Sequence, residues 1–571
     1  MKRAAVVLAL LAGTLFLPSP GFADDSDARV ARVGYVGGEV SYQRGDVEGW
    51  NGLRVNTPLV SGDSLFAAAG GRAEADLGNG VVVRLDGGTL VDLVNNTRDV
   101  AQLGIRSGAL DLRARSFPQG FAVEIDTPNA AATILEPGRY RVQFADRAVR
   151  YEVVQGAMSL AVGGQQLDVR EGESLEIEDA DPPTYAYGTL AGRTPFQSWC
   201  DGRDSRFERS PSARYVNADV VGYEDLDDYG SWRESPEYGR VWTPRMAEGW
   251  APYQSGRWIW QDPFGWTWVS DESWGWAPYH YGRWAWTGNY WGWVPPPRRG
   301  YRGPAAVMGI EAVYAPALVA FVGGRNWGAS LSIGGPAIGW VPLAPSERYY
   351  YPWQSAPREA GRYRNIAVNN AVTVVNYNAF GAGAVRPIRV ARTEIARAPV
   401  IGSTAVGVAP RRESLVVAPG RNAGPKAVPR VVADRPLAAR LVPPPRPQPF
   451  AQKAAEIERT GRPAPRPAAT EDPVGKPFVA GVRAPAGVKA VSALAPEAPK
   501  ELKPRSGAVV RPPKKIERDI APPPSARRGA GPAPVPKTAA PAPAKREAPP
   551  ARGERQAPPA ARPTERPEEK K

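Results

Sequence analysis

The chain has 571 residues, one cysteine, one histidine and a formal net charge of +14. A single cysteine excludes an internal disulfide, and one cysteine with one histidine is too few for a Cys/His metal cluster, so we expect no metal and no cofactor. From about residue 391 the chain carries 35 basic and 16 acidic residues, a net charge of +19, which leaves about −5 for residues 1–390. The basic excess therefore belongs to the C-terminal part.

The N-terminus predicts an export signal. Residues 1–3 are a short basic region, residues 4–17 are apolar, and residues 21–23 offer the small side chains that a signal peptidase requires, so cleavage is expected after Ala23. The apolar run is short for a membrane span, and no later segment reaches 18 uninterrupted apolar residues. We expect a mature chain in the periplasm, at the cell surface or secreted, without a transmembrane span and without a nucleic-acid partner.

Residues 24–180 show the alternation of a β domain. Apolar Ala73, Ala75 and Leu77 alternate with polar residues before the turn pair Asn79-Gly80, and alternation resumes through residues 81–85. Two alternating runs joined by Asn-Gly are typical of a hairpin with a two-residue turn. No segment of helical period competes, which predicts an antiparallel, all-β domain.

This series resembles the FecR domain over residues 60–162. The resemblance is carried by Gly70-Gly71-Arg72-Ala73-Glu74-Ala75, Leu77, Asn79-Gly80, Val83-Arg84-Leu85-Asp86, Leu103, Ile105, Gly108, Leu110, Phe121, Val123, Thr127-Pro128, Ala130, Gly138, Tyr140-Arg141-Val142, Val154 and Gly156. FecR is known as an inner-membrane regulator whose cytoplasmic N-terminus controls an extracytoplasmic-function sigma factor. The resemblance implies a periplasmic β-rich interaction module, whereas the N-terminus of this chain resembles a cleaved signal and not a cytoplasmic domain.

Residues 181–228 are expected to form a linker. Their single cysteine, Cys200, is expected to be a half-buried apolar residue and not a nucleophile. The acidic run Glu224-Asp225-Leu226-Asp227-Asp228 lacks the spaced ligands and the glycine of an EF-hand loop, which predicts a solvated surface run and not a calcium site.

Residues 229–380 predict a second, Trp-rich β domain. Thirteen of the 18 tryptophans lie between residues 232 and 293, and the run Gly-Trp-Ala-Pro-Tyr followed by Gly-Arg-Trp occurs at residues 249–258 and again 26 residues later. The tryptophans form i, i+2 pairs separated by turn residues, and both members of such a pair lie on the same face of a strand. We therefore expect an antiparallel meander with one indole-rich face.

The Trp-rich stretch resembles an uncharacterised family that often follows FecR-like domains in exported bacterial proteins. The resemblance covers about residues 215–380, brings no assigned activity, and is carried by the acidic run with Tyr229-Gly230-Ser231-Trp232, the two repeats, residues 314–324 and Gly339-Trp340-Val341-Pro342-Leu343.

Two interpretations of the indole face are open. Thirteen indoles represent roughly 2,600 Å² of buried area, far more than a soluble monomer exposes in one patch, so most of them should form a core. A few could remain exposed as stacking platforms for sugar rings or for an aromatic-rich partner. The candidate ligand-binding residues are Trp250, Trp258, Trp260, Arg257, Trp276, Trp284, Trp286 and Arg283.

No catalytic residue is predicted. A triad would have to use His280, but the other copy of the repeat has Gln254 at that position, so the repeat does not need an imidazole. Asp262, Asp271 and Glu272 lie among the tryptophans and keep a glycan hydrolase as a second alternative, because that chemistry needs two carboxylates beside a sugar.

Residues 381–571 are rich in Pro, Ala, Lys and Arg and are expected to be disordered. The fold class expected is therefore mainly β, with a FecR-like domain, a Trp-rich meander and a long basic tail. The function expected first is a non-enzymatic envelope scaffold that contacts glycan or protein partners through its β domains and anionic cell-wall or outer-membrane polymers through its tail. The first alternative is a FecR-type periplasmic signalling regulator acting on a sigma-factor pathway.

Overall fold

The structure is a computed structural model that describes residues 28–327, 335–351, 363–402, 408–417, 428, 430–460, 474–478, 484 and 486–491. The chain divides into one unit of residues 1–510, which contains all of these, and a second unit of residues 511–571, which lies outside the described residues. The predicted leader, residues 1–23, and the tail beyond residue 491 also lie outside them.

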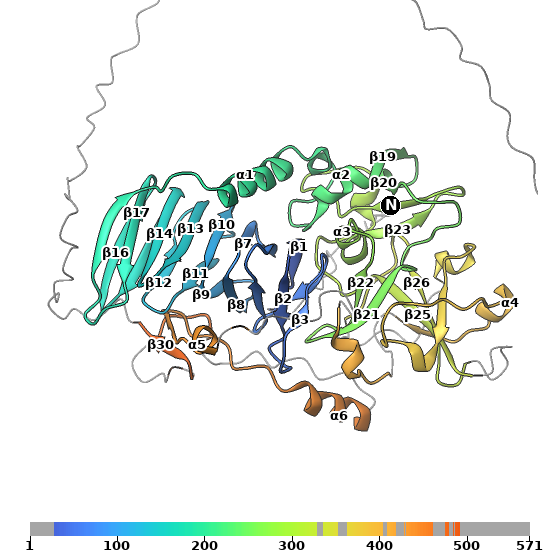
Figure 1. Ribbon diagram of the computed structural model, residues 1–571. Coiled ribbons are helices and arrows are strands. Elements are labelled where there is room, and N and C mark those ends of the chain that lie inside the picture. Colours follow the sequence, from blue (N-terminus) through green and yellow to red (C-terminus); the bar gives the residue numbers. More distant parts are fainter. Residues whose placement is uncertain are drawn as a thin grey trace, which may run out of the picture. The chain divides into compact units, whose positions relative to one another are not determined.

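Two nine-stranded sheets form the N-terminal part of the molecule (Figure 1). The first sheet contains, in spatial order, β18 (Tyr185–Thr189), β17 (Glu173–Glu178), β14 (Ala148–Gln155), β13 (Gly138–Ala145), β10 (Ala109–Ala114), β7 (Val81–Leu85), β6 (Arg72–Gly78), β1 (Ala31–Gly37) and β4 (Pro58–Leu59). The second sheet contains β16 (Gln165–Arg170), β15 (Ala157–Val162), β12 (Ala131–Ile134), β11 (Ala122–Asp126), β9 (Val100–Ser107), β8 (Thr89–Asn96), β5 (Ser64–Ala67), β2 (Val40–Gln43) and β3 (Asn51–Gly52).

The inner faces of these sheets share one core, so we call this part the sandwich. In the first sheet Leu112 stands opposite Val83 on one side and Tyr140 on the other, and all three are buried. The second sheet contributes residues such as Ile125 and Leu160 to the same core. Neighbouring strands run antiparallel except β9 and β11, which are parallel. The prediction of a mainly β, antiparallel domain is confirmed.

The predicted hairpin at Asn79-Gly80 joins β6 and β7. Ala75 faces Val83 and Gly78 faces Val81, which leaves Asn79 and Gly80 as the two loop residues. Their φ angles are 51° and 77°, the positive values that a type I′ turn requires.

The segment expected to be a linker is ordered and packs on the sandwich. It contains α1 (Pro195–Glu208), η1 (Pro211–Arg214), η2 (Tyr223–Asp225) and α2 (Leu226–Tyr229). Helix α1 begins at a capping box in which Gln197 N donates to Thr194 Oγ1 at 3.2 Å and Thr194 N donates to Gln197 Oε1 at 3.0 Å. The linker prediction was wrong for this helix, because Asp204 and Arg203 of α1 form ion pairs with Arg84 and Glu74, which come more than 100 residues earlier in the chain.

The Trp-rich part is built from short sheets and turns. Its elements are β19 (Gly230–Ser235), β20 (Gly239–Pro244), β21 (Gly256–Gln261), β22 (Gly265–Ser270), α3 (Trp276–His280), β23 (Arg283–Trp286), β24 (Trp291–Val294), η3 (Pro304–Val307), β25 (Val319–Gly324), β26 (Ala337–Pro342), η4 (Arg364–Ala367), β27 (Thr373–Asn376) and η5 (Tyr377–Ala379). The two repeats each supply a hairpin: β21–β22 alone, and β23–β24 within the sheet β19-β20-β24-β23.

The same glycine opens the first strand of each repeat. Gly256 and Gly282 have φ angles of +158° and +71°, and a Cβ at either one would lie about 2.5 Å from a carbonyl oxygen of the partner strand and against Trp268 or Trp293. Both copies of the repeat therefore have a glycine at the point where the backbone lies against an indole ring. Trp274 and Trp276 are one of the i, i+2 pairs expected on a strand, and for them that prediction was wrong, because Trp276 begins α3 and Trp274 lies in the turn before it.

Hairpin β21–β22 buries both of its faces. Trp258, Trp260 and Trp268 lie in the core of the Trp-rich part, whereas Ile259 and Val269 on the opposite face belong to the core of the sandwich. Arg44 of the sandwich donates from Nη1 to Trp260 O at 3.0 Å. A strand that is apolar on both faces is typical of a buried position between two layers.

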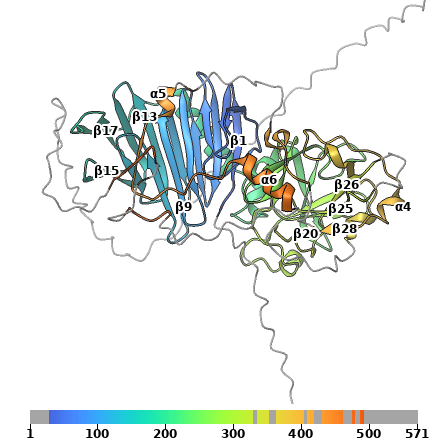
Figure 2. The same cartoon turned by 90° about the horizontal axis from the view of Figure 1, so that it is seen from below.

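The described parts of residues 381–491 contain helices and strands, although the sequence predicted disorder there. They contain α4 (Arg392–Ile395), β28 (Val400–Gly402), η6 (Arg412–Leu415), α5 (Arg430–Ala433), β29 (Leu437–Ala439), α6 (Phe450–Thr460) and β30 (Val488–Ala490). Strand β28 extends the sheet β27-β26-β25, and α5 and β29 contact β9 of the second sheet. Figure 2, the view from below, shows α5 beside the strands of the sandwich. Among the described residues, no helix is both long and apolar enough to cross a membrane.

Candidate functional site

The predicted indole surface is mostly interior. Of the thirteen tryptophans between residues 232 and 293, ten are buried, including Trp258, Trp260, Trp276 and Trp284. Trp250 is partly buried, and Trp286 is 37% exposed. The core interpretation of the indole face therefore describes this structure, and Trp286 is the member of the candidate set that faces solvent.

The two arginines of the repeat lie beside this core in different surroundings. Arg283 donates from Nε to Glu347 O at 2.9 Å, and burial lowers its pKa to about 10. Arg257 is 6% exposed, and its Nε and Nη1 atoms have no hydrogen-bond partner among the described residues. Burial, and then the charge of Arg54, lower the pKa of Arg257. A ligand role for either arginine stays a prediction.

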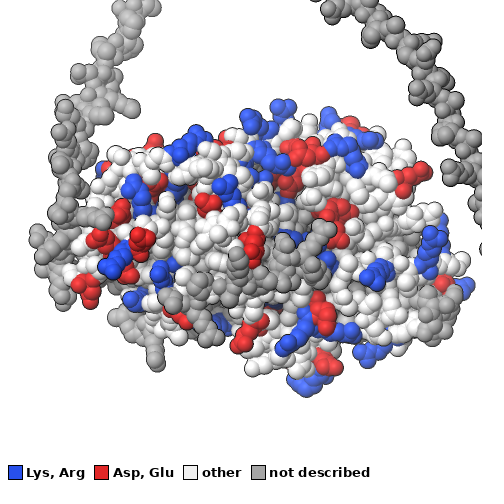
Figure 3. Space-filling view, in the orientation of Figure 1, with Lys and Arg blue, Asp and Glu red and all other residues white. Residues whose placement is uncertain are grey.

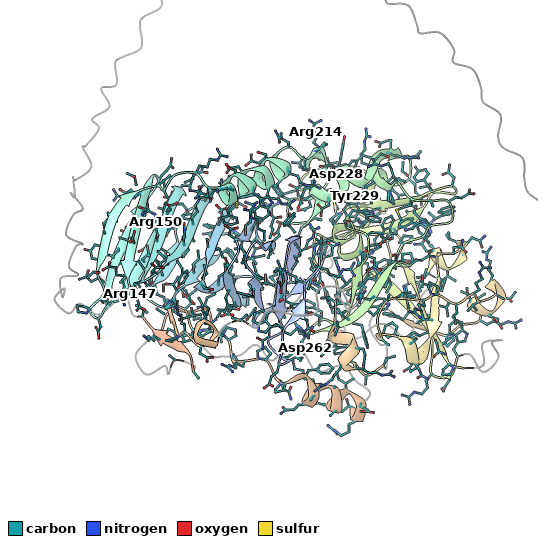
Figure 4. The ribbon with its side chains drawn as sticks, in the orientation of Figure 1. Arg147, Arg150, Arg214, Asp228, Tyr229 and Asp262 are labelled. Carbon is teal, nitrogen blue, oxygen red and sulfur yellow. The ribbon has the colours of Figure 1, made fainter. Side chains whose placement is uncertain are left out.

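The carboxylates proposed for glycan hydrolysis each have protein partners. Asp262, labelled in Figure 4, pairs with Lys453 of α6, and Asp271 pairs with Arg54 at 2.7 Å. Glu272 accepts hydrogen bonds from Trp250 Nε1 at 3.2 Å and from Tyr279 OH at 3.2 Å, and burial raises its pKa. These contacts give each carboxylate a structural role.

His280 is buried and neutral. Burial lowers its pKa to about 4, its Nδ1 lies 2.8 Å from Ala315 O, and its ring stacks on Tyr314. Among the described residues, no hydrogen bond or ion pair joins His280 to a carboxylate that could orient it as a base. Across the described ranges, no group of three or more His, Cys, Asp or Glu side chains is arranged to hold a metal ion.

The outer face of the first sheet carries a row of alternating charges. Directly opposed residues on successive strands are Glu74, Arg84, Asp111, Arg141 and Glu152, on β6, β7, β10, β13 and β14. Each charge therefore has the opposite sign on its neighbouring strand, an arrangement that stabilises cross-strand pairs. We call these five residues the charge row.

Helix α1 covers the end of the charge row formed by Glu74 and Arg84. Arg84 donates to Glu74 Oε2 at 2.7 Å and to Asp204 Oδ1 of the helix at 2.7 Å, while Arg203 of the helix donates to Glu74 Oε1 at 2.5 Å. Burial opposes ionisation of Glu74, but the Arg203 and Arg84 guanidinium groups outweigh it and lower its pKa to about 2. On the same helix, Cys200 is fully buried and burial raises its pKa, so it does not present a thiolate.

The acidic run was expected on the surface, and for two of its members that was wrong. Glu224 and Asp225 are buried beside Arg32 of β1, which is 1% exposed and donates to Asp225 Oδ2. Asp227 accepts a hydrogen bond from Ser212 N at 3.1 Å. Asp228 is the exposed member and lies next to Tyr229 in Figure 4. A buried arginine on the first strand required carboxylate partners, and this run supplies them.

The outer face of the second sheet carries a buried polar row. Gln102 on β9 stands beside Glu124 on β11, which faces Thr133 on β12. Gln102 and Glu124 are almost inaccessible, and so is Asp126, two residues further along β11. We call these four residues the polar row. Gln102 Nε2 donates to Asp126 Oδ2 at 2.8 Å.

A segment of the C-terminal region covers this polar row. We call residues 435–442 the strap. Arg440 N and Leu441 N both donate to Glu124 Oε1, at 3.0 and 2.9 Å, and Gln102 Nε2 donates to Leu441 O at 3.2 Å. Ala438 N donates to Thr127 O at 2.8 Å. The strap therefore contacts the sheet mainly through its own backbone.

Burial raises the pKa of both Glu124 and Asp126. Burial, and then the charge of Glu124, raise the pKa of Asp126 well above its ordinary value. For Glu124 the two strap amides oppose the effect of burial, because they favour its charged form. Glu124 is therefore the carboxyl group of the pair that accepts the backbone of the strap.

Sequence reasoning missed both outer faces. The charge row was visible only as polar residues between apolar ones, because its pairing depends on register between strands. The strap was included in a Pro-rich tail, although Leu437, Leu441 and Val442 form an aliphatic group there that could have suggested burial. On the face shown in Figure 3, Lys and Arg are interspersed with Asp and Glu and form no large patch of one sign.

The family described as FecR protein matches residues 63–159, and the family of unknown function DUF6600 matches residues 223–347. Two crystal structures, each titled as a candidate anti-sigma factor from Parabacteroides distasonis, are similar at 15% and 13% identity; they cover 24% and 30% of this chain and 71% and 94% of those chains. Both have TM-scores of 0.21, so neither bears on fold or function here. Curated proteins give no match.

The family matches agree with the architecture. The FecR match spans most of the sandwich, and the second match begins at Tyr223 in η2 and includes both tryptophan repeats. Both resemblances read from the sequence are confirmed. The chain is therefore a FecR-domain protein with a downstream Trp-rich domain of a family of unknown function.

Proposed function

We propose that this protein is an extracytoplasmic regulator of the FecR type, which acts by binding a protein partner and not by catalysis. The observation that carries the proposal is the FecR match over residues 63–159, which favours the regulatory alternative over the envelope scaffold expected first. FecR itself controls a sigma-factor pathway, so the output proposed here is a change in transcription.

The surfaces of the sandwich support a protein partner. Both outer faces already bind protein segments: α1 on the charge row, and the strap on the polar row. The aromatic platforms that a sugar would need are mostly inside the Trp-rich core. Location outside the cytoplasm is part of the proposal and is supported by the leader predicted at residues 1–23.

The proposal is tested by deleting and overexpressing the gene in its own bacterium and sequencing the RNA. We expect a set of transcripts whose promoters share one recognition element to change in opposite directions in the two strains. A chain lacking residues 1–23 serves as the control, because it should accumulate in the cytoplasm and leave those transcripts unchanged. Transcripts that respond to neither deletion nor overexpression would overturn the proposal.

The scaffold interpretation makes a different prediction. If glycan binding is its function, the protein should sediment together with purified peptidoglycan or envelope polysaccharide. Trp286→Ala should then reduce the sedimented fraction more than a substitution of Arg240 does. The regulator proposed here stays in the supernatant.

A further inference from the structure

The strap fits the second sheet as a bound peptide would. Leu437 Cδ1 fills the space left by Gly104 on β9, where a Cβ would lie 2.4 Å from that methyl group. Leu437 is 3% exposed, and Ala438 and Ala439 next to it are also buried. Gly104 has no positive φ that would require glycine, so the space it leaves is used by the strap.

The polar contacts of the strap are made mainly by its backbone. Glu124 Oε1 accepts two consecutive backbone N–H groups, which converge on one oxygen only where a chain bends, as the strap does at Arg440. One side chain of the strap also takes part, because Arg440 Nη1 donates to Thr133 Oγ1 at 3.2 Å. Any segment that bends in this way and has no proline at these two positions can supply both N–H groups.

The strap is held by partners other than the sheet as well. Phe478 N donates to Arg440 O at 2.8 Å, and Val491 N donates to Ala439 O at 2.9 Å. Strand β29 of the strap also pairs in parallel with β30, in a two-stranded sheet outside the two sheets of the sandwich core. A covering layer of this kind opens at a lower free-energy cost than the core that it covers.

The polar row offers hydrogen-bonding groups to whatever segment lies over it. With the strap absent, Glu124 loses both backbone donors, and Gln102 loses Leu441 O as an acceptor. Water can then hydrate these groups, so the free-energy difference between the covered and the uncovered face is smaller than the number of hydrogen bonds suggests. A peptide backbone that docks in place of the strap restores the same hydrogen bonds.

We propose that the outer face of the second sheet is a docking site for a short segment of a protein partner that bends as the strap does, and that the strap occupies it in cis until the partner displaces it. The segment that fits has an aliphatic residue for the Gly104 space, two small residues after it, then a basic residue and an aliphatic residue with free backbone N–H groups. This rests on the proposed function only in taking the partner to be a protein.

The test uses the mature chain, residues 24–571, and a fluorescein-labelled peptide of residues 434–443. In the variant Leu441→Pro the strap loses one N–H to Glu124, so we expect this variant to bind the peptide about tenfold or more tighter than the wild type, measured by fluorescence anisotropy. Adding Gly104→Ala or Glu124→Gln to Leu441→Pro should abolish that gain. A peptide carrying the same Leu441→Pro change is the matched control and should not bind.

Arg440→Ala is the control within the strap, because it keeps both backbone N–H groups and removes only the contact with Thr133; we expect a smaller gain than for Leu441→Pro. Equal peptide binding by wild type and Leu441→Pro, with the circular dichroism unchanged, would overturn the proposal. A Leu441→Pro chain that instead forms a dimer through exchanged straps would assign the face to a second copy and overturn the partner stated here.

Hydrogen exchange of the wild-type protein keeps the proposal falsifiable if Leu441→Pro does not fold. We expect the amides of residues 438–442 to exchange through local opening, well before the amide of Ile125 in β11. If the amides of residues 438–442 and the amide of Ile125 all exchange only on global unfolding, the proposal is overturned. Because these experiments use purified protein, they can succeed while the transcription test fails, which separates the two proposals.

Discussion

Arg32 in the first strand of the sandwich is buried against Asp225, 193 residues further along the chain. Asn56 Oδ1 accepts a hydrogen bond from Arg32 Nε at 3.0 Å, and Glu224 lies 3.7 Å from Arg32 Nη1. This cluster joins the FecR side of the molecule to the start of the DUF6600 match. Burial of a charge is tolerated only where an opposite charge compensates it.

Removing Asp225 should therefore cost much more than removing a surface partner. We expect Asp225→Ala to lower the free energy of unfolding by about 3 kcal/mol, because it leaves Arg32 buried with a weaker counter-charge. In the double variant Arg32→Met/Asp225→Leu, the loss of unfolding free energy should be smaller than the sum of the losses in Arg32→Met and in Asp225→Leu. Urea denaturation measures all of these values, and Glu234→Ala, from the exposed pair Arg240–Glu234, is the control, with an expected loss within about 0.5 kcal/mol.

Glu224 should make stability depend on pH. Burial, and then the charge of Asp225, raise its pKa to about 7, against the opposing effect of Arg32. The folded chain therefore holds a proton that the unfolded chain releases above its ordinary pKa of 4.5, so this contribution to stability is complete below that value and is lost as the pH rises toward 7. In Glu224→Gln the denaturation midpoint should therefore fall less steeply than in the wild type as the pH rises from 4.5 toward 7. An equal slope in the two proteins would contradict the raised pKa of Glu224.

Two tryptophans of one strand should differ in their effect on stability. Trp284 is fully buried and Trp286, two residues later on β23, is 37% exposed. We expect Trp284→Ala to lower the free energy of unfolding by about 3–5 kcal/mol, because it leaves a large cavity in the aromatic core. Trp286→Ala should change it by less than about 1 kcal/mol. Similar losses for both variants, measured by chemical denaturation, would show that the indole-rich face is not packed as described.

Cys200 should be unreactive in the folded protein. It lies on the face of α1 that packs on the first sheet, and burial raises its pKa, so neither exposure nor a thiolate favours attack on a thiol reagent. We expect labelling by a disulfide reagent to follow unfolding in urea and to be slow in buffer. Asp204→Ala removes the contact of α1 with Arg84 and should accelerate labelling; rapid labelling of the wild type would contradict the packing of α1.

Local patterns in the sequence predicted the sandwich well because alternation reflects a physical period. Ala73, Ala75, Val83 and Leu85 point inward as their spacing predicts, and Asn79-Gly80 forms the expected turn. The outer faces could not be predicted in the same way. Glu74 and Arg84 are ten residues apart, but Glu124 and Arg440 are 316 residues apart, and nothing in either segment alone indicates that they meet.

The candidate site illustrates the same limit. Trp258 and Trp260 were correctly placed on one face, but whether that face meets solvent or other side chains depends on Phe321, Trp340 and Phe380, which come much later in the chain. Ile259 lies between Trp258 and Trp260, and Val269 follows Trp268. They carried the clearer signal, since a strand apolar on both faces needs two neighbours.

Those two side chains also bear on where the chain can be divided. Ile259 and Val269 belong to the hydrophobic core of the sandwich although they lie about 100 residues beyond the FecR match, so a fragment that ends with that match would expose to water the apolar surface that they cover. A fragment meant to fold alone should therefore extend past β22.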